Sequence, residues 1–455
     1  MPTEAPKTMS IRSPKYRLAS LIVVLSMILF LTNANATTYF VRSGASGNGT
    51  SWANAWGNLN SISWSSLNAG DTVCVAGGSY SGNLNTSKSG TSGNPITVRR
   101  ATPSDSTCGS NSSGWNSAYD AQVVMTGTIT LSTSYVTIDG AVADGIKIVM
   151  QNPNGTNYVG IGVGAPTNFV TLRYIEVAGP CPAGQTCNQN GDHRSISLNN
   201  WNGSSYDLQN NMTMQYMNLH GACNLLWSAH STNMIIEHSR FADSSDETPG
   251  NPNCHPNVIA EQDSTNITFR YNEITHWEVE GIMACPSGAC QSSWQIYGNL
   301  WHDPFAGYHR ILEAQSNANG PYLFYNNTVV NVTYECAGTA NGGSYLAGSQ
   351  SRNNLYYNSV GPCGLPSDDY DYANKALGEA NGQTGTTDPF VNSAAKTIAG
   401  YHLKAHTNPG TNLGAPYNVD FDGNPRATWD RGAFEFGGSS ASLPNPPAGL
   451  AAIVR

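Results

Sequence analysis

Apolar residues recur along the middle of this chain in a pattern that six segments of eight residues share. In each segment the first, third and eighth positions are apolar. The segments are residues 170–177, 212–219, 234–241, 267–274, 294–301 and 322–329. Residues 135–140 begin the series, and residues 354–360 continue it with one residue fewer. The copies start 22 to 42 residues apart, so a short strand core is constant while the connecting segments vary in length.

A constant strand core with variable connections predicts a parallel β-solenoid with loops inserted at its corners. Propellers and leucine-rich repeats keep a steady period, so the irregular spacing excludes both. The composition agrees: hydrophobic residues make up 39% of the chain, enough for a large core, whereas charged residues make up only 11%. Long helices draw on Lys, Glu and Arg, so their scarcity argues against a helical protein.

Position six of the pattern is polar in five successive copies and predicts a ladder at one corner. Asn tolerates the left-handed backbone that a tight corner needs, and stacked amides can hydrogen-bond from coil to coil. The ladder residues are Ser239, Asn272, Asn299, Asn327 and Asn358. At position eight the predicted stack inside the tube is Phe241, Ile274, Trp301, Val329 and Val360.

With these features the chain resembles the pectate lyase superfamily, whose members carry an asparagine ladder at one corner of a right-handed parallel β-helix. Its opening is similar to the N-terminal coils of bacterial polysaccharide lyases of the alginate lyase, chondroitinase B and family 9 pectate lyase type. The segments that carry this similarity are 40–44, 52–56, 69–80, 94–99 and 134–140. Residues 419–426 and 430–435 resemble the closing segment of many secreted bacterial β-helix proteins.

The resemblance implies an all-β fold: a single-stranded right-handed parallel β-helix of roughly ten coils with an N-terminal cap, over residues 37–437. It is specific for the fold rather than for the reaction, because one scaffold hosts many functions. Residues 438–455 are rich in Pro and Ser and are expected to be a tail or linker.

Residues 1–36 have the features of a signal peptide. Lys15 and Arg17 precede an almost wholly apolar stretch over residues 18–31, and Ala34 and Ala36 supply a cleavage site of small residues. The alternative is a membrane anchor, but a spanning helix needs about 20 apolar residues. We expect cleavage after Ala36 and a secreted or cell-surface protein with no membrane span.

The charge of the chain limits its partners. The formal net charge is −9, and removal of residues 1–36, with four basic side chains and one acidic one, leaves −12. We expect no nucleic-acid partner, because phosphate neutralisation requires clustered Lys and Arg. A polyuronate would also be repelled unless calcium or a local arginine cluster offsets the field. The expected partner is an extracellular polysaccharide, and we expect a monomer.

The chain has ten cysteines, all after residue 36, and an even number in an exported chain favours disulfides. The alternative, a structural zinc site, needs four closely placed ligands, and no Cys-x-x-Cys pair occurs. The predicted bonds are Cys74–Cys108, Cys181–Cys187, Cys223–Cys254, Cys285–Cys290 and Cys336–Cys363.

The resemblance implies a substrate cleft on the sheet that precedes the repeated strands. Its strands would be residues 195–198, 224–227, 258–261, 281–283, 310–313 and 345–347. The candidate catalytic residues there are Glu261, Glu313, Arg310, His309 and His255. Candidate substrate-binding residues are Arg194, His193 and His276, and candidate calcium ligands are Asp243, Asp246 and Glu247.

Two reactions fit these candidates. Glu261 and Glu313 stand two coils apart, about 10 Å between backbones, and side-chain reach brings them toward the ~6.5–9.5 Å of an inverting glycosidase. For a lyase, Arg310 and Arg194 would neutralise the uronate carboxylate, and His255, His309 or Arg310 would be the base. Residues alternate faces along a strand, so Arg310 and Glu313, three positions apart, would face opposite sides if both lay in it. We therefore expect the strand to begin after Arg310, which leaves His309 and Arg310 on the incoming loop above the cleft.

The chain departs from the family in one respect. There is no lysine between Lys147 and Lys375, so the central coils lack the lysine base of those lyases. The grouped aspartates and Arg-x-Lys of polygalacturonases are also missing. Two functions remain open: a carbohydrate-active enzyme, lyase or glycosidase, and a non-catalytic surface or adhesion protein that binds glycan on exposed Trp and Tyr.

Overall fold

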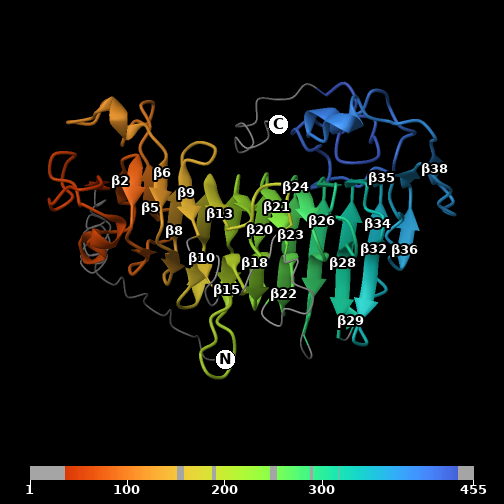
Figure 1. Cartoon of the computed structure of the whole chain (residues 1–455), viewed down its shortest axis with the longest axis horizontal. Coiled ribbons are helices and arrows are strands. Elements are labelled where there is room, and N and C mark those ends of the chain that lie inside the picture. Colours follow the sequence, from red (N-terminus) through yellow and green to blue (C-terminus); the bar gives the residue numbers. More distant parts are fainter. Residues whose placement is uncertain are drawn as a thin grey trace, which may run out of the picture. The chain divides into compact units, whose positions relative to one another are not determined.

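Three long parallel sheets run along the chain, and most coils contribute one strand to each of them (Figure 1). The computed structural model describes residues 36–150, 158–186, 191–245, 254–286, 290–316 and 318–438. Residues 1–36 and 37–455 are two separate units. The described part of the second unit is an all-β parallel β-helix, as predicted. None of the helices in the described residues is long and apolar enough to cross a membrane.

Within the described residues, sheets A and B contain twelve strands each, against roughly ten predicted coils, and sheet C contains nine. Sheet A consists of β1 (Thr38–Val41), β2 (Thr72–Val75), β5 (Ile96–Arg100), β8 (Val136–Asp139), β12 (Val170–Arg173), β16 (Thr213–Gln215), β20 (Ile235–Glu237), β23 (Ile267–Arg270), β26 (Trp294–Tyr297), β30 (Tyr322–Tyr325), β34 (Gln350–Arg352) and β36 (Ser367–Asp369). Sheet B consists of β3 (Gly78–Tyr80), β6 (Val123–Met125), β9 (Ile146–Val149), β13 (Ile175–Ala178), β17 (Asn218–His220), β21 (Arg240–Ser244), β24 (Glu273–Trp277), β27 (Leu300–His302), β31 (Thr328–Val330), β35 (Leu355–Tyr357), β37 (Tyr372–Ala373) and β38 (Gln383–Thr384).

Sheet C consists of β4 (Leu84–Asn85), β7 (Ile129–Leu131), β10 (Val159–Val163), β14 (Arg194–Leu198), β18 (Asn224–Ala229), β22 (Asn257–Gln262), β25 (Glu280–Ala284), β28 (Arg310–Gln315) and β32 (Glu335–Ala340). Two short sheets pair β11 (Thr167–Asn168), β15 (Gln209–Asn210) and β19 (Ser231–Thr232), and β29 (Ala318–Asn319) with β33 (Ser344–Tyr345). The 3₁₀ turns are η1 (Leu59–Ser61), η2 (Trp64–Ser66), η3 (Ser117–Tyr119), η4 (Ser393–Ala395) and η5 (Ala399–Tyr401).

Each repeated eight-residue segment consists of a sheet A strand, a corner of one or two residues, and the beginning of a sheet B strand. In residues 170–177, β12 ends, Tyr174 turns the corner with a φ of 58°, and β13 begins. The left-handed residue therefore stands at position five, whereas the sequence pattern places it at position six. Tyr216, His238 and Tyr271 occupy position five of the following coils, also with positive φ. The four rings stack at centroid distances of 4.8, 5.3 and 5.2 Å.

A ladder of buried polar side chains occupies position six, as predicted, and links neighbouring coils. The backbone N–H of Ser239 donates to Oδ1 of Asn272 at 2.9 Å, and that of Asn272 donates to Oδ1 of Asn299 at 2.9 Å. Asn299 and Asn327 continue the series with N–H donors at 3.0 and 2.9 Å from the next side chain. Each amide NH₂ group of these three asparagines also donates to a carbonyl of the preceding coil. The corner is therefore held by side-chain hydrogen bonds in both directions.

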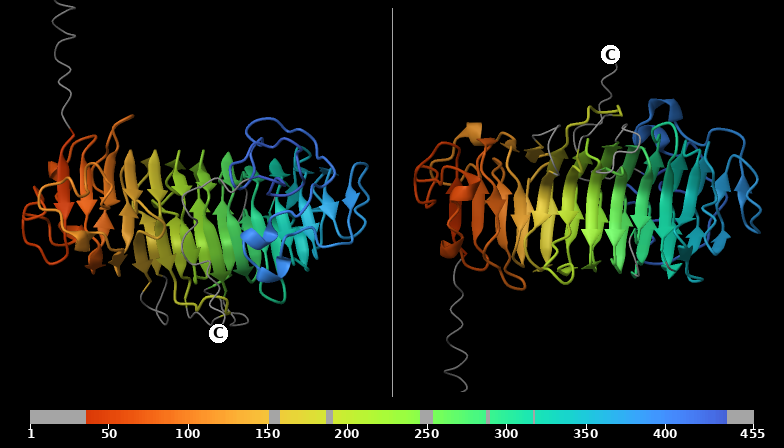
Figure 2. Two further views of the ribbon diagram at one scale, coloured as in Figure 1. Left: turned by 90° about the horizontal axis from the view of Figure 1, so that it is seen from above. Right: turned by 60° about the horizontal axis from the view of Figure 1, so that its bottom comes forward.

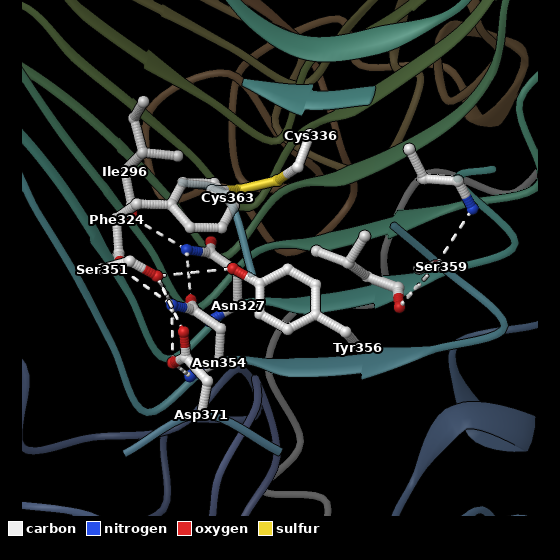
Figure 3. The surroundings of a disulfide bond; sticks show 12 residues. Ile296, Phe324, Asn327, Cys336, Ser351, Asn354, Tyr356, Ser359, Cys363 and Asp371 are labelled. Carbon is white, nitrogen blue, oxygen red and sulfur yellow. Dashed lines mark hydrogen bonds between the residues drawn. A yellow bond between two sulfur atoms is a disulfide. The ribbon is translucent and has the colours of Figure 1, made fainter. Parts of the chain in front are cut away.

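The fifth predicted member of the ladder is wrong, because Asn354 and not Asn358 follows Asn327 (Figure 3). This coil has Ser349 and Ser351 at positions one and three in place of apolar residues, which hides its register in the sequence. Asn358 is exposed instead. The ladder then ends on a buried carboxylate, since the N–H of Asn354 donates to Oδ1 of Asp371 at 2.7 Å.

Position eight forms the predicted column inside the tube. Phe241, Ile274, Trp301 and Val329 pair in register and are buried. The corrected register replaces Val360 by Tyr356, which is fully buried in the same column. At the other end of the chain, residues 42–71 add large side chains to this core, namely Trp56, Leu59, Ile62, Trp64 and Leu67.

Four of the five predicted disulfides are present: Cys74–Cys108, Cys223–Cys254, Cys285–Cys290 and Cys336–Cys363. Cys181 is also disulfide-bonded, and Cys187, its predicted partner, lies outside the described residues. The bond from Cys223 to Cys254 joins the segments just before β18 and β22, with Cα atoms 6.0 Å apart. It therefore fixes where two neighbouring strands of sheet C begin.

The C-terminal segment, residues 386–437, returns over coils of the C-terminal half of the β-helix (Figure 1 and Figure 2). The hydroxyl of Tyr401 donates to Oδ2 of Asp303 at 2.7 Å. The N–H of Ala433 donates to Oγ1 of Thr328 at 2.8 Å. The segment is thus hydrogen-bonded to residues of the β-helix that precede it by about a hundred positions.

We expect Asn299→Ala to lower the free energy of unfolding by about 2–4 kcal/mol, because it leaves the buried N–H of Asn272 unpaired. Denaturant titration under non-reducing conditions measures the change. Asn392→Ala is the matched control, since Asn392 is exposed and makes no side-chain capping bond, and it should stay within about 0.5 kcal/mol of wild type. Wild-type stability of Asn299→Ala would contradict the role of the ladder.

Candidate active site

Two rows of side chains project from the outer face of sheet C. Strand pairing aligns the first row as Arg194, Asn224, Asn257, Glu280, Arg310 and Glu335. It aligns the second row as Ser197, Trp227, Ala260, Met283, Glu313 and Gly338. Ionisable side chains are concentrated on β25, β28 and β32, where the first row contributes Glu280, Arg310 and Glu335 and the second row contributes Glu313.

A local bend puts both rows on the same face. In β28 the adjacent residues Ile311 and Leu312 are both buried in the core, which interrupts the alternation of faces. Arg310 and Glu313 therefore project on the same side and form an ion pair. The strand begins at Arg310 rather than after it, so the bend and not a later start explains the shared face.

The last predicted strand of this sheet is wrong. Residues 335–340 form β32 next to β28, whereas Tyr345 belongs to β33 in a separate two-stranded sheet. The sequence of β32, Glu-Cys-Ala-Gly-Thr-Ala, has too few large apolar residues to show a strand pattern.

Glu280 and Glu313 form a hydrogen-bonded pair of carboxyl groups on this face. Their side chains are almost fully buried, with exposures of 2% and 4%. Burial, and then the charge of Glu313, raises the pKa of Glu280 to about 9, against the opposing effect of Arg310. Glu280 therefore keeps its proton at neutral pH and donates it toward Glu313.

Glu313 is held in place by three further donors. Arg310 forms the ion pair, the side-chain amide of Gln315 donates to Oε1, and the hydroxyl of Tyr308 lies 3.4 Å from Oε2. The Arg310 guanidinium also lies 4.7 Å from the centre of the Tyr308 ring. Tyr308 is partly exposed, so the pair lies just beneath the protein surface.

Arg310 has a second acidic partner, since Nη2 lies 3.0 Å from Oε2 of Glu335. Gly338 leaves the space for this contact. A Cβ there would lie 2.6 Å from Arg310 Nη1 and 2.5 Å from Glu335 Oε2. Both charged edges of the guanidinium are therefore engaged with carboxylates.

His255 joins the cluster from the preceding coil. Its Nδ1 lies 3.3 Å from Oε2 of Glu280, and its side chain is more than half exposed. The neighbouring Cys254 is tied to Cys223, and the His255 carbonyl accepts from Asn257 Nδ2 at 2.7 Å. Of the predicted catalytic residues, the structure thus brings together His255, Arg310 and Glu313.

Glu261 does not join them, which corrects the predicted carboxylate pair. Its register partner two coils on is Ala314 rather than Glu313, and its side chain points into the tube with no exposed surface. Burial raises the pKa of Glu261 to about 8, and Oε2 accepts from the N–H of Ser264 at 3.1 Å. Glu261 is therefore a neutral core residue.

His309 is placed to support the loop rather than to act as a base. Its Nε2 accepts from the backbone N–H groups of Thr333 and Tyr334, at 3.0 and 3.3 Å. The ring is buried against Trp277, and burial lowers the pKa of His309. The nitrogen that a base would use is occupied by these two donors.

The three predicted substrate-binding residues lie elsewhere. Arg194 is bound to Asp192 and lies 4.1 Å above the Trp227 ring, four coil spacings from Arg310, or about 19 Å. His193 is buried, with Nδ1 3.0 Å from the carbonyl of Gly191. His276 lies in β24 of sheet B, one residue before the strand ends, and so lies on a different face.

The predicted calcium ligands are described only in part. Asp243 is buried, accepts from the N–H of Gly184 at 2.7 Å, and lies 3.3 Å from Nδ1 of His276. Asp246 and Glu247 lie outside the described residues. Among the side chains that are described, no group of three His, Cys, Asp or Glu is arranged to hold a metal ion. Calcium binding at this run stays a prediction.

The sequence reasoning missed the role of Glu280, Glu335 and Tyr308. The position of Glu280 could have been inferred from the sequence. Glu280 precedes the inward residue Ile282 by two positions, as Arg310 precedes Leu312, so the two side chains occupy equivalent places in neighbouring coils. Glu335 had no such signal, since its strand is nearly free of apolar residues.

The fold and this site define a parallel β-helix protein with a buried carboxyl pair on one sheet. No protein-family model and no curated protein matches the chain.

Among solved structures, the pectate lyase Pel9A is similar with a TM-score of 0.44 and 12% identity, over 88% of this chain and 97% of that chain. An alginate lyase from Paenibacillus sp. str. FPU-7 is similar with a TM-score of 0.41 and 11% identity, over 76% and 98%. A rhamnogalacturonan lyase has a TM-score of 0.39 and 12% identity, over 78% and 91%. At these identities the likeness concerns the fold alone.

The raised pKa of Glu280 predicts a specific pH dependence of stability. A carboxyl group with a raised folded-state pKa stabilises the fold fully below its unfolded pKa near 4.5, and this contribution is lost as pH rises through about 9. Glu280→Gln has no such titration. Between pH 5 and pH 9, the free energy of unfolding of wild type should therefore fall relative to that of Glu280→Gln by at least about 1–2 kcal/mol. Denaturant titration at each pH measures this difference. If the free energies of unfolding of wild type and Glu280→Gln change in parallel between pH 5 and pH 9, Glu280 is already ionised in the folded protein.

Proposed function

We propose that this chain is a secreted glycoside hydrolase that cleaves an extracellular polysaccharide on the outer face of sheet C. The Glu280–Glu313 pair carries the proposal, because one carboxyl group keeps its proton at pH 7 beside a carboxylate that Arg310 fixes. Hydrolysis of a glycosidic bond needs an acid to protonate the leaving oxygen and a base to activate water. Export is supported by the features of residues 1–36 and by the disulfides.

In the proposed reaction Glu280 protonates the glycosidic oxygen and Glu313 accepts a proton from the attacking water. The hydrogen bond between the two carboxyl groups implies a separation shorter than the ~6.5–9.5 Å of inverting or the ~5–5.5 Å of retaining glycosidases. They would act as a dyad that shares one proton, with the water in contact with both groups. Arg310, Gln315 and Tyr308 keep the carboxylate of Glu313 oriented during this exchange.

The charges on this face favour hydrolysis of a neutral glycan over elimination from a polyuronate. Elimination needs a cation that is free to neutralise the uronate carboxylate. Arg310 is bound to Glu313 and Glu335, and Arg194 is bound to Asp192. A substrate carboxylate would have to displace one of these acidic partners, at a cost in ion-pair energy.

Replacement of either carboxyl group by its amide should lower kcat by about 10²–10⁴-fold with little change in KM, since the acid or base is lost while the shape is kept. The mature protein is first screened on neutral polysaccharides and polyuronates for new reducing ends and for unsaturated products. Glu280→Gln and Glu313→Gln are then compared with Glu261→Gln on the substrate found. Glu261 is the matched control, because it lies in the same sheet but points inward.

Wild-type turnover by both Glu280→Gln and Glu313→Gln would remove the pair from the mechanism. Unsaturated products from a polyuronate, with Glu313→Gln largely active, would show that the reaction is elimination instead.

A second candidate, glycan binding without cleavage, is favoured by one exposed aromatic pair. Trp201 is 57% exposed and packs edge-on against Tyr206 at 5.2 Å, in the loop after β14. Exposed rings of this kind can stack on sugar faces.

If the screen gives no product, Trp201→Ala should reduce retention of the protein on an insoluble polysaccharide several-fold. Tyr206→Phe keeps the ring and is the matched control.

A further inference from the structure

A pocket of about 390 Å³ opens on the outer face of sheet B. Its principal lining side chains are Arg100, Gln122, Val142, Asp144, Lys147 and Glu176. The volume lies near the lower end of the range of small-molecule sites, which suits a ligand of one or two rings. The pocket is built around β9 and β13, whereas the Glu280–Glu313 pair lies on sheet C, so the two places are separate.

The charges in the pocket balance one another. Lys147 Nζ lies 2.7 Å from Glu176 Oε1, and His220 Nε2 contacts the same oxygen at 3.1 Å. Arg100 Nη2 is paired with Asp120 at 2.7 Å. Two basic and two acidic side chains line the pocket, so an anion would meet carboxylates and a cation would meet ammonium and guanidinium groups. A neutral ligand avoids both.

Two buried polar atoms of the lining residues have no hydrogen-bond partner within the described residues. They are Oδ1 of Asp144 and Nη1 of Arg100, on side chains more than nine-tenths buried. A buried polar group without a partner costs about 1–3 kcal/mol. Both side chains line the pocket, so a ligand there would supply the missing acceptor for Arg100 and the missing donor for Asp144.

One wall of the pocket is apolar. Val142 is 45% exposed, which is high for a side chain of this kind, and it stands beside the charged residues of the lining. A sugar ring matches this combination, because its C–H face is apolar and each of its hydroxyl groups both donates and accepts.

We propose that this pocket binds one or two rings of a neutral saccharide. One ring hydroxyl accepts from Arg100 Nη1, another donates to Asp144 Oδ1, and the C–H face of the ring lies against Val142. Gln122 secures the loop of Asp144, since its Nε2 donates to the Asp144 carbonyl at 2.6 Å. The site goes beyond the proposed hydrolysis and does not depend on it.

Ligand-observed NMR titration of the mature protein with the methyl pyranosides of glucose, galactose, mannose and xylose tests the proposal. At least one should bind with a Kd in the range of about 1–10 mM. Asp144→Asn and Val142→Glu should each weaken that binding by about fivefold or more. Asn accepts the left-handed backbone of Asp144 as readily as Asp does, and Val142 is exposed, so both variants should fold.

Asp263→Asn is the matched control, because Asp263 has a similar positive φ of 57° and is exposed outside the pocket. It should bind like wild type, and so should Glu313→Gln, which reports on the sheet C site. Asp144→Asn should leave any cleavage activity unchanged. Loss of saccharide binding to the pocket can therefore be distinguished from loss of hydrolysis on sheet C. Absence of saturable binding by all four glycosides would overturn the proposal. Unchanged affinity in both pocket variants, or displacement of the glycoside by inorganic phosphate, would overturn it as well.

Discussion

The regular stacking of coils is the constraint on which this molecule depends. Parallel strands lie about 4.8 Å apart, so each residue stands directly over its counterpart in the next coil. A column that points inward must be apolar or must satisfy its own hydrogen bonds, because water is absent there. The column from Ser239 to Asp371 meets the second condition, with each amide bonded to the coils on both sides. Once that corner is in register, the outward columns of sheets B and C are fixed as well.

The same constraint explains what the sequence could and could not predict. The fold was predictable because inward columns such as Phe241, Ile274 and Trp301 leave a periodic record in the chain. Where a coil uses small residues inside, as at Ser351 or in β32, that record disappears and the register was misplaced. The paired cysteines of neighbouring coils gave an independent and correct indication of register.

The site was harder to predict, because it depends on which face each side chain takes. The bend at Ile311 and Leu312 changes the alternation of faces within the strand, and nothing in the residue types marks it. Glu261 and Glu280 show the consequence. Both are acids in neighbouring strands of sheet C, and burial raises the pKa of both. Glu261 is enclosed in the core, whereas Glu280 meets a second carboxyl group just beneath the outer face of sheet C.

The returning C-terminal segment also affects how the molecule opens and assembles. In a solenoid each coil contacts only its neighbours, so the ends can fray independently of the middle. Residues 386–437 join distant coils: Ala433 bonds to Thr328, 105 residues earlier, and Arg431 donates to the carbonyl of Asp371. Several coils near β27 to β37 must therefore open together rather than one at a time. Since contacts of such long sequence separation form slowly, the early coils can assemble in order while the last third becomes cooperative only when the C-terminus has arrived.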